Sequence, residues 1–397
     1  MQIKFIHIFD DDKFIDPTIK LFEEVIPEQS VYYVNKSKNT GFKYVKSSNV
    51  SRVDLSIQQE KRDLLQFINS DKSHVVFLHA LESNKQSLVF EILPTIKKVW
   101  FIWGYDLYGN WPLLKKNIYQ PSTKSLLNLK TDLKKNLIHN SLSFYLFQKR
   151  HLIKKFSRKG FHILNNAFDT SFYRAAQLMD YVVPVVPTEY SLIKKMNLKA
   201  QYAPFTYGCI EDLLGSKINE SVSKQPNIIV GNSADPSNNH LEVLSELAKL
   251  DLHDRKVYVP LSYSGSLQYK EKVIEAGREF LGSNFFPLID FMTLEEYNNI
   301  LLSCGTLIFN HVRQQGVGNI ITLGYLGATL FLNEESPVYS YYQSLEMKIF
   351  NVKDISSKLF YELNEQEEKS NKITFFDLYS RNAVHNKIKT LVQIVTH

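Results

Sequence analysis

The chain has 397 residues, which is more than a single hydrophobic core comfortably serves and favours two domains of roughly 150 to 200 residues each. Apolar residues make up 44% and aromatic residues 13%, which excludes a disordered chain, and the two cysteines are too few for a disulfide framework or a cysteine zinc site. The net charge of +6 hides a cationic segment at 113–160, where twelve Lys and Arg oppose the single Asp132 and the rest of the chain is left at −5.

The first half alternates β-rich runs with helical stretches. MQIKFIHIFDDD has no apolar core of signal-peptide length and predicts a strand that ends in a loop. We expect next a helix near 17–25, the strand SVYYV, a helix near 57–68, and the strands HVVFLHA, KVWFIWG and DYVVPVV. This rhythm predicts a parallel sheet flanked by helices.

A second alternation begins after residue 226. The polar segment 211–226 has no clear apolar period and predicts a linker. After it we expect strands at NIIVGN, KVYVPL, FFPLI, TLIFNH and ATLFLN, with helices near 239–250, 267–281, 294–304 and from 318. The longest apolar run, 319–332, is short and broken by glycines, so we expect a cytoplasmic protein without a membrane span.

Two α/β halves of similar size indicate two Rossmann-like domains, which we place at 1–215 and 225–397. Ligands of open parallel sheets bind beyond the carboxyl ends of the strands. We therefore expect a site in a cleft between the two domains, lined by residues that follow strands.

The first candidate motif is VGNSADPSNNH at 230–240, which follows the first strand of the second domain. Gly231 permits close backbone approach, and Asn232, Ser233 and residues 237–239 place small polar groups before a helix N-terminus. Free amides there suit a diphosphate. Because such turns are often plain helix caps, the motif alone leaves both interpretations open.

The second motif is FNHVRQQGVGNI at 309–320, again a strand followed by a polar turn and a helix. Arg313 offers a fork of donors for phosphate, Gln314 and Gln315 can contact a base or sugar hydroxyl, and Gly316 and Gly318 let backbone amides approach a ligand. The spacing matches neither a Walker loop nor a dinucleotide fingerprint. The alternative is an arginine paired with a carboxylate on a loop.

The third motif, VWFIWGYDLYGNW at 99–111, places Asp106 after a strand of the first domain. Asp106 is a candidate general base toward an acceptor hydroxyl, or else a cap of the following helix. Trp103, Tyr105 and Tyr108 are candidate platforms for sugar rings, although aromatic clusters more often form core.

Two other strand ends carry single candidates, His79 and Glu335. His79 could bind phosphate, act as a base or be satisfied locally, and Glu335 could bind ribose hydroxyls. The run Asp10 to Asp12 resembles a metal site but is more typical of a solvated loop. We expect no obligatory metal, because cationic side chains and helix dipoles can neutralise a departing diphosphate.

The order and separation of WGYDLY, VGNSADPSNNH, RQQGVGN and NEESP resemble the TDP-N-acetylfucosamine:lipid II N-acetylfucosaminyltransferase family, glycosyltransferase family 56. The resemblance runs from about 77 to 337. It implies a GT-B fold and transfer of 4-acetamido-4,6-dideoxygalactose to an undecaprenyl-diphosphate disaccharide in the synthesis of enterobacterial common antigen.

The resemblance also implies a division of labour among the candidates. The residues implied to line the donor pocket are Gly231, Asn232, Ser233, Asn238, His240, Arg313, Gln314, Gln315, Gly316 and Gly318. Those implied to face them from the acceptor side are His79, Trp103, Gly104 and Asp106. Asn319 stands where the family pattern has Thr, and the segment 113–160 is longer and more basic than the family suggests.

The expected mechanism is a direct displacement at the anomeric carbon of a nucleoside-diphosphate sugar, with Arg313 stabilising the departing diphosphate and Asp106 or His79 accepting the proton. SLSFYLFQKRHLIKKF could form an amphipathic helix on the anionic inner face of the bacterial plasma membrane, near a polyprenyl-linked acceptor, or a solvated helical face. No RNA-recognition motif accompanies the basic residues. A sugar-nucleotide epimerase and a non-catalytic sugar-nucleotide binding module are the alternative functions.

Overall fold

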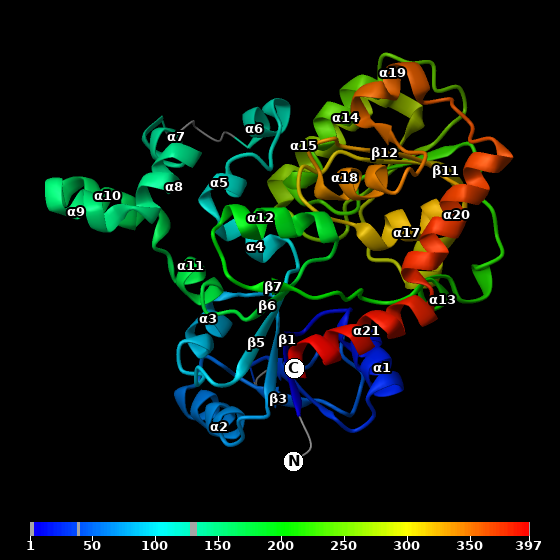
Figure 1. Cartoon of the computed structure of the whole chain (residues 1–397). Helices are drawn as coiled ribbons and strands as arrows, with labels where there is room; N and C mark the ends of the chain where they lie inside the picture. The colour runs from blue at the N-terminus through cyan, green and yellow to red at the C-terminus, as the bar shows by residue number, and fades with distance from the viewer. Residues whose placement is uncertain (1–3, 38–39, 128–132, 397) are drawn as a thin grey trace. The chain divides into compact units, whose positions relative to one another are not determined.

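The computed structural model describes residues 4–37, 40–127 and 133–396, which form two compact units. Unit 1 comprises Met1–Lys116, Asp132–Gly208 and Arg381–His397, and unit 2 comprises Asn117–Thr131 and Cys209–Ser380. Each unit contains a parallel sheet with helices, as the alternation in the sequence predicts (Figure 1). Lys130 and Asp132 of the basic segment lie outside the described residues.

The sheet of unit 1 has seven strands in the order β3-β2-β1-β4-β5-β6-β7, and neighbouring strands run parallel within the described residues. Strand β1, with the sequence FIHIF, lies inside the sheet between β2 and β4 and is buried on both faces, which explains the continuous apolar run in the sequence. The strands are β1 (Phe5–Asp10), β2 (Ser30–Asn35), β3 (Ser51–Val53), β4 (Val75–His79), β5 (Lys97–Phe101), β6 (Tyr181–Val183) and β7 (Gln201–Tyr202).

The helices of unit 1 either cover this sheet or form the basic segment. In α1, the apolar residues Ile15, Ile19 and Phe22 recur at helical spacing and are all buried. The helices are α1 (Ile15–Val25), α2 (Gln58–Asn69), α3 (Ser83–Val89), α4 (Tyr105–Asn110), α5 (Pro112–Lys115), α7 (Leu133–Ile138), α8 (Ser141–Gln148), α9 (Arg150–Phe156), α10 (Arg158–Phe168), α11 (Ser171–Ala176), α12 (Tyr190–Lys195) and α21 (Arg381–Thr396).

The sheet of unit 2 has six strands in the order β10-β9-β8-β11-β12-β13, again parallel within the described residues. Both cysteines are buried and neither forms a disulfide, Cys304 in β11 and Cys209 before α13. The strands are β8 (Asn227–Val230), β9 (Val257–Pro260), β10 (Phe285–Leu288), β11 (Cys304–Phe309), β12 (Thr329–Leu332) and β13 (Phe350–Asn351).

Helix α15 of unit 2 illustrates how the sequence sets element ends. The Ser266 hydroxyl accepts a hydrogen bond from the backbone N–H of Tyr269 at its start, and Gly282 adopts a positive φ of 51° at its end. The helices of this unit are α6 (Pro121–Leu126), α13 (Ile210–Leu214), α14 (His240–Leu247), α15 (Leu267–Leu281), α16 (Leu294–Leu301), α17 (Val317–Tyr325), α18 (Pro337–Ser344), α19 (Ile355–Lys358) and α20 (Glu365–Tyr379).

The expected linker at 211–226 begins as a helix rather than as open chain. Helix α13 packs on α17 of the same unit, and Gly215 adopts a positive φ of 52° where the helix ends. The polar composition of this stretch concealed the short helix because only Ile210 and Leu214 are buried.

The C-terminal helix α21 belongs to unit 1, whereas we expected it in the second domain. It packs on α1, and its Arg381 pairs with Glu24 at 2.9 Å. The Tyr181 hydroxyl of β6 also donates a hydrogen bond to the Ile394 carbonyl, at 3.0 Å. These contacts are long-range, so periodicity along the sequence could not reveal them.

Residues 117–127, which we name the strap, belong to unit 2 although the sequence on both sides belongs to unit 1. The backbone N–H of Gln120 donates to Asn239 Oδ1 at 2.8 Å, and Thr123 donates through its N–H and hydroxyl to Glu242 at 2.9 and 2.8 Å. The strap is therefore fixed on the first turn of α14. We expected one domain boundary near residue 215, so the assignment of the strap to unit 2 was not predicted.

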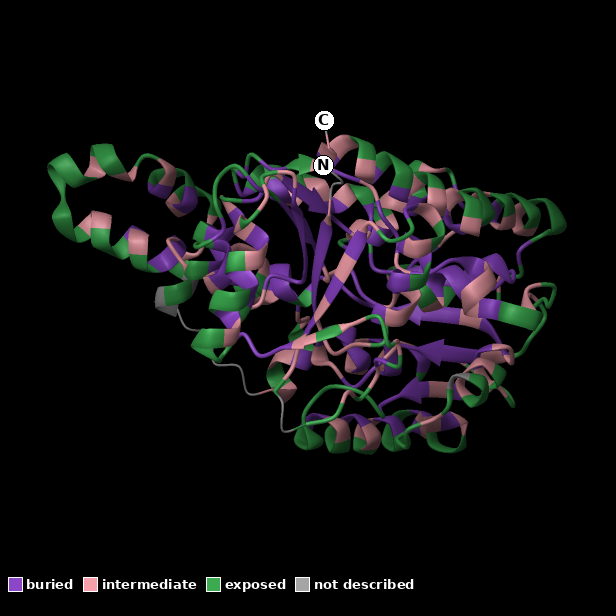
Figure 2. Ribbon diagram, turned by 90° about the horizontal axis from the view of Figure 1, so that it is seen from below, coloured by how far each residue is buried: buried purple, intermediate pink, exposed green. Residues whose placement is uncertain are grey.

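The basic segment is divided into short helices instead of one amphipathic helix. Ser157 separates α9 from α10 by accepting a hydrogen bond from the Gly160 N–H at 3.0 Å. Buried Phe144 and Phe147 of α8 pack against Phe168 and anchor the segment to unit 1. Helices α9 and α10 pack on each other and extend away from the sheet of unit 1, and most of their surface is exposed (Figure 2).

Among the described residues, no helix combines the length and the apolar composition needed to cross a bilayer.

Candidate functional site

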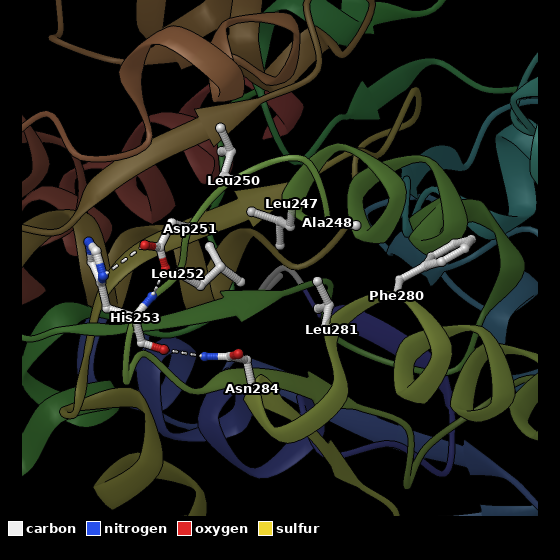
Figure 3. A pocket seen from close by; sticks show the side chains of 9 residues that line it. All are labelled: Leu247, Ala248, Leu250, Asp251, Leu252, His253, Phe280, Leu281 and Asn284. Carbon is white, nitrogen blue, oxygen red and sulfur yellow. Dashed lines mark hydrogen bonds and ion pairs between the residues drawn. The ribbon is translucent and has the colours of Figure 1, made fainter.

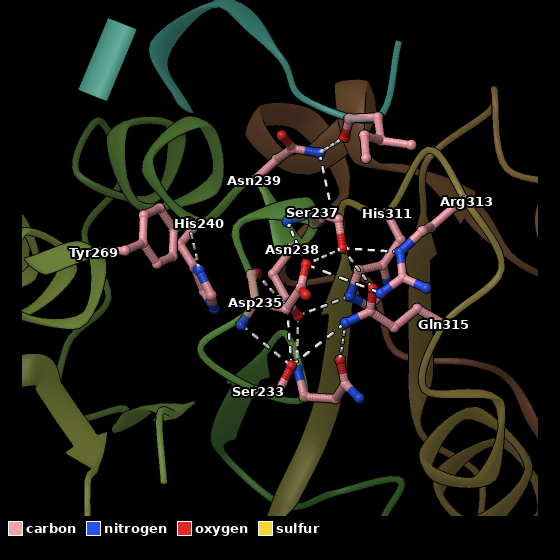
Figure 4. A network of polar contacts seen from close by, with 12 residues as sticks. Ser233, Asp235, Ser237, Asn238, Asn239, His240, Tyr269, His311, Arg313 and Gln315 are labelled. Carbon is pink, nitrogen blue, oxygen red and sulfur yellow. Dashed lines mark hydrogen bonds and ion pairs between the residues drawn. The ribbon is translucent and has the colours of Figure 1, made fainter. Parts of the chain in front are cut away.

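Two of the sequence motifs meet at the carboxyl edge of the unit 2 sheet. Strands β8 and β11 are neighbours, with Val230 opposite Ile308, so the loops that follow them emerge side by side. One loop leads into α14 and the other into α17. Figure 4 shows their polar side chains pointing toward one another.

Asn238 holds the first loop in shape from a buried position. Its Oδ1 accepts the backbone N–H of Asn232 at 2.9 Å and contacts His311 Nε2 at 2.7 Å. Its Nδ2 donates to the Asp235 carbonyl at 2.8 Å and to Ser233 Oγ at 3.3 Å. Buried polar side chains are normally hydrogen-bonded, and breaking any of these bonds would leave a buried group without a partner. Asn238 therefore holds the turn in one conformation.

Gly231 turns the chain directly after β8. It adopts a positive φ of 68°, and a Cβ atom there would lie 2.6 Å from Asn238 Oδ1 and 2.9 Å from His240 Nε2. Only glycine avoids both the backbone strain and the collision. Gly231 therefore packs closely against Asn238 and His240. The approach of its backbone to a ligand stays a prediction.

Gln315 joins the two loops. Its Nε2 donates to Asn232 Oδ1 at 2.9 Å, and its Oε1 accepts from the Ser237 hydroxyl at 2.6 Å. The neighbouring Gln314 is also buried, and its Oε1 has no hydrogen-bond partner among the described residues. A buried amide oxygen without a partner costs free energy, which makes Gln314 rather than Gln315 the candidate to contact a ligand.

Arg313 lies between the loops with its side chain 11% exposed. Its Nε donates to the Ser237 hydroxyl at 3.0 Å, and its Nη2 lies 3.9 Å from Asp235 Oδ1. These contacts fix the guanidinium at the strand edge. The structure thus brings Arg313 and the Gly231 turn into one site, while the role of Arg313 in binding stays a prediction.

His240, the first residue of α14, is fully buried. Its Nδ1 contacts the Tyr269 hydroxyl at 3.0 Å, and burial lowers its pKa to about 3, so the ring is neutral. Its Nε2 is buried without a partner among the described residues and lies beneath Gly231. This places His240 behind the turn instead of on the lining surface.

Helices α14 and α17 both begin at this edge of the sheet. The residues that precede them, Asn239 and Gly316, adopt left-handed conformations, and neither helix has a side-chain hydrogen bond from its N-cap. The first-turn amides of both helices thus add positive electrostatic potential beside Arg313. Together they can bind an anion such as a diphosphate.

The remaining predicted donor residues have different surroundings. Gly318 has open space around it and is exposed, and the Asn319 side chain donates to the Tyr297 hydroxyl at 2.7 Å, outside the two loops. Glu335 is exposed after β12, a neighbour of β11, and therefore lies at the same edge of the sheet. Gly318 and Glu335 are accessible to a ligand.

Sequence reasoning missed several residues of this site. Asn310 exchanges hydrogen bonds with Gln120 of the strap at 2.9 and 3.3 Å, and Asn239 Nδ2 donates to the carbonyls of Asn310 and Ile118 at 3.0 and 3.2 Å. Asp235 and His311 stood inside the motifs but were not chosen. Gln120 carries no local signal, because only tertiary structure brings the strap to α14.

In unit 1, Asp106 is buried and holds neighbouring segments together through hydrogen bonds. Its carboxylate accepts hydrogen bonds from Trp100 Nε1 at 2.7 Å and from the backbone N–H groups of Leu81 and Trp103 at 2.8 and 3.0 Å. Burial raises its pKa, and these donors oppose that shift. A carboxylate enclosed in this way is poorly placed to reach a substrate, so the geometry does not support the expected role as base.

The other acceptor-side candidates divide into exposed and buried groups. Trp103 is partly exposed, and Gly104 starts α4 with a positive φ of 88°. Tyr108 is buried beside the carboxyl group of Glu189, so it offers no stacking surface. His79 is fully buried, and burial holds its pKa well below the usual value.

A hollow of about 160 Å³ in unit 2 lies elsewhere (Figure 3). Its lining residues lie at the C-terminal ends of α14 and α15 and in the segments that lead into β9 and β10, which places it at the amino edge of the sheet. Among the described residues, no group of three or more His, Cys, Asp or Glu is arranged to hold a metal ion.

Solved structures of other proteins share this two-unit fold. Sucrose-phosphate synthase from Thermosynechococcus elongatus superposes with a TM-score of 0.64 at 8% identity, covering 99% of both chains. A glycosyltransferase from Rickettsia africae gives 0.61 at 10% identity, covering 100% of this chain and 99% of its own. Anabaena HepE, solved in complex with UDP and glucose, gives 0.59 at 8% identity, covering 98% and 100%. These similarities confirm the GT-B fold class.

The sequence itself matches a family model over residues 195–392, described as 4-alpha-L-fucosyltransferase, glycosyl transferase group 56. The matched range contains all the donor-side motifs, from Gly231 to Glu335, and confirms the resemblance drawn from them. Over residues 195–392 the chain is thus similar to the 4-alpha-L-fucosyltransferase family, glycosyltransferase group 56, and it is a glycosyltransferase of the GT-B fold.

Proposed function

We propose that the enzyme transfers a 4-acetamido-4,6-dideoxyhexose from a dTDP-sugar, or a related nucleoside-diphosphate sugar, to a saccharide carried on a polyprenyl diphosphate. Such a reaction serves the synthesis of bacterial surface polysaccharide of the enterobacterial common antigen type. The observation that carries the proposal is the convergence of Arg313 and the N-termini of α14 and α17 on one strand edge of unit 2.

The donor diphosphate is the group best matched to that edge. A guanidinium and two helix N-termini neutralise a dianion without requiring a metal ion, so we propose no obligatory metal. The UDP and glucose bound by Anabaena HepE, a protein of the same fold, support a nucleotide-sugar donor. We assign Gln314, whose buried Oε1 has no partner among the described residues, to a polar group of the donor.

The proposed reaction is a direct displacement at the anomeric carbon. The acceptor hydroxyl oxygen bonds to C1 of the donor sugar, its proton leaves to a base, and the bond between C1 and the diphosphate oxygen breaks. Negative charge then grows on the diphosphate, where Arg313 and the helix amides stabilise it. The hydrogen bond from Arg313 to Ser237 and its ion pair with Asp235 already hold the guanidinium in place, so little reorganisation is needed.

We further propose that the basic segment holds the enzyme on the anionic cytoplasmic face of the membrane, where a polyprenyl-linked acceptor resides. Phe156 is 90% exposed at the junction of α9 and α10. The exposed cations Lys154, Lys155, Arg158 and Lys159 surround it in sequence. An apolar side chain within a cationic cluster suits a surface of anionic lipid headgroups, at about 1 kcal/mol per basic residue near the surface.

A donor screen tests the catalytic proposal. Purified enzyme is incubated with dTDP- and UDP-sugars, with and without bacterial lipid extract, and free nucleoside diphosphate and glycosylated lipid are measured. We expect diphosphate release that depends on the lipid extract. Release without any acceptor and with an altered sugar indicates an epimerase, whereas binding without release indicates a binding module, and either result contradicts the proposal.

Flotation with liposomes tests the membrane proposal separately. We expect binding to vesicles that contain phosphatidylglycerol at low salt, and weaker binding after Phe156→Ser or after Lys154→Glu with Lys155→Glu. A matched control is Lys249→Glu, which removes an exposed cation of unit 2 that pairs with Glu246. Equal flotation of all variants, or none by the unaltered protein, overturns the membrane assignment.

A further inference from the structure

Four aromatic side chains gather at the carboxyl edge of the unit 1 sheet. Phe14 lies 5.9 Å from Trp103 and 5.6 Å from Tyr207 between ring centroids, and Trp103 lies 5.8 Å from Tyr207 and 6.4 Å from Tyr105. Phe14 and Tyr105 are 38% and 41% exposed. We name these residues the aromatic cluster. It follows β1, β5 and β7, where ligands of parallel sheets bind.

The polar centre of the aromatic cluster is the Tyr207 hydroxyl, which the sequence motifs did not single out. It lies 2.6 Å from Trp103 Nε1 and 2.6 Å from His79 Nδ1. His79 Nε2 in turn lies 3.1 Å from His7 Nδ1, in the interior of the sheet. Tyr207, His79 and His7 thus form one chain of hydrogen bonds that runs from a half-buried tyrosine into the core.

The protons in this chain can be assigned from burial. Both imidazoles are neutral, because burial lowers the pKa of His7 to about 3 and that of His79 well below its usual value. His7 Nε2 is buried without a partner among the described residues, and the rings of Phe22 and Phe77 pack against this imidazole. A buried N–H group without an acceptor is rare, so the single proton of His7 belongs on Nδ1.

This assignment fixes the direction of every hydrogen bond. His7 Nδ1 donates to His79 Nε2, His79 Nδ1 therefore carries the other proton, and it donates to the Tyr207 oxygen. Trp103 Nε1 is always a donor, so the same oxygen accepts a second hydrogen bond. The Tyr207 proton then has no acceptor among the described residues, and this hydroxyl is left to donate to a ligand.

The surroundings of Tyr207 define the chemistry of that ligand. Burial raises the pKa of Tyr207, and the nearby carboxyl groups of Asp106 and Asp12 raise it further, so the phenol keeps its proton. A carboxylate at this position disfavours a phosphate group. Exposed aromatic faces together with one neutral hydroxyl donor are typical of sites for sugar rings, whose C–H faces pack on aromatic side chains.

We propose that the aromatic cluster binds a sugar ring of the acceptor and that Tyr207 donates a hydrogen bond to an oxygen of that ring. The inference rests on the proposed function and names Tyr207 as the residue of unit 1 that binds the acceptor saccharide. His79 is then a positioning residue, since it reaches no ligand itself and acts by filling one lone pair of the Tyr207 oxygen. The role of base expected for His79 is replaced by this one.

Tryptophan fluorescence can test the site directly. Of the three tryptophans, Trp100 and Trp111 are buried, so a change on adding a saccharide reports Trp103. We expect N,N′-diacetylchitobiose to change the emission of the full-length protein in a saturable way. Tyr207→Phe should weaken this binding about 10-fold, the size expected for one hydrogen bond.

The matched control is Tyr190→Phe, which removes a hydroxyl of the same unit that donates to the Ala200 carbonyl at 3.1 Å. It should bind the disaccharide as the unaltered protein does. Donor affinity, measured by calorimetry with the active nucleotide sugar, should be equal in all three proteins. His79→Gln offers a second variant, with a rise in the acceptor KM and no change in donor affinity.

The inference is overturned if the unaltered protein shows no fluorescence response, or if Tyr207→Phe binds the disaccharide as tightly as the control. Failure of every nucleotide sugar to bind the unaltered protein would instead defeat the proposed function. The two failures are therefore distinguishable, because the fluorescence titration needs no donor.

Discussion

The carboxyl edges of the two parallel sheets carry different side chains, although the loops that follow the strands emerge at this edge in both units. In unit 2 the loops carry amides, hydroxyls and the ion pair between Arg313 and Asp235, with two helix N-termini beside them. In unit 1 the corresponding edge combines two buried carboxyl groups, Asp106 and Glu189, and the neutral imidazole of His79 with exposed aromatic rings.

We propose that this difference lets one architecture serve two kinds of binding. The fold places loops at the strand ends in both units, and the side chains decide what binds there. A cationic edge with free amides suits a phosphate-bearing ligand, whereas aromatic faces with a neutral donor suit an uncharged sugar. The following substitutions test whether each edge has the chemistry assigned to it.

Arg313→Ala should have the largest effect, because it removes the only charged side chain that we assign to the departing diphosphate. We expect kcat to fall by about 10²- to 10³-fold, or about 3–4 kcal/mol of transition-state stabilisation, in assays of nucleoside diphosphate release. Arg278→Ala, which removes an exposed arginine of α15 in the same unit, is the control. An unchanged turnover in Arg313→Ala would remove the cationic edge from the mechanism.

The second largest effect is expected for Glu189→Gln, which should change how the free energy of unfolding depends on pH. Burial raises the pKa of Glu189 to about 8, from 4.5, so the folded state holds a proton that the unfolded chain releases. The stability contributed by the neutral acid is fully present below pH 4.5 and is lost as the pH rises toward 8. The difference in free energy of unfolding between Glu189→Gln and the unaltered protein should therefore shift in favour of the variant by about 2–4 kcal/mol from pH 5 to pH 8.5.

Urea unfolding at several pH values measures this difference. Glu246→Gln, which alters an exposed carboxylate of unit 2 paired with Lys249, should give a curve parallel to that of the unaltered protein. Parallel curves for Glu189→Gln as well would mean that the buried carboxyl of unit 1 is ionised, and the contrast between the two edges would weaken.

Gly231→Ala should have the smallest effect of the three, confined to unit 2. The positive φ and the collision of a Cβ atom with Asn238 should lower the free energy of unfolding by about 2 kcal/mol or more. Gly318→Ala is the matched control, since it has open space and lies inside α17, where alanine is favoured by up to about 1 kcal/mol. Equal stability of the two variants would show that the β8 turn is not rigid.

The sequence predicted most regular elements because their signals are local. Helix 267–281 was expected with the bounds that α15 has, and the strand at NIIV corresponds to β8. The short edge strands β3, β7 and β13 were missed, since two or three residues show no periodicity. The assignments of α21 and of the strap to their units also failed, because they depend on contacts between residues far apart in the sequence.

The candidate site was predicted unevenly for the same reason. Motifs that follow strands indicated the two loops of unit 2, and the structure brings Gly231, Asn238, Arg313 and Gln315 together. Burial could not be judged from a motif, so His240 was expected on the lining surface. Tyr207 was missed because only its hydrogen bonds, and no neighbouring residue in the sequence, distinguish it from other tyrosines.

The exchange of segments between the units has a consequence for synthesis. Because the strap is made early and α21 is made after the whole of unit 2, a chain emerging from the ribosome can complete unit 1 only once its final helix, 16 residues long, has been released. A gene fragment cut at residue 208 would encode a first half without α21 and a second half without the strap. Neither product would carry all the segments of its own unit, so the halves must be studied by substitution in the intact polypeptide.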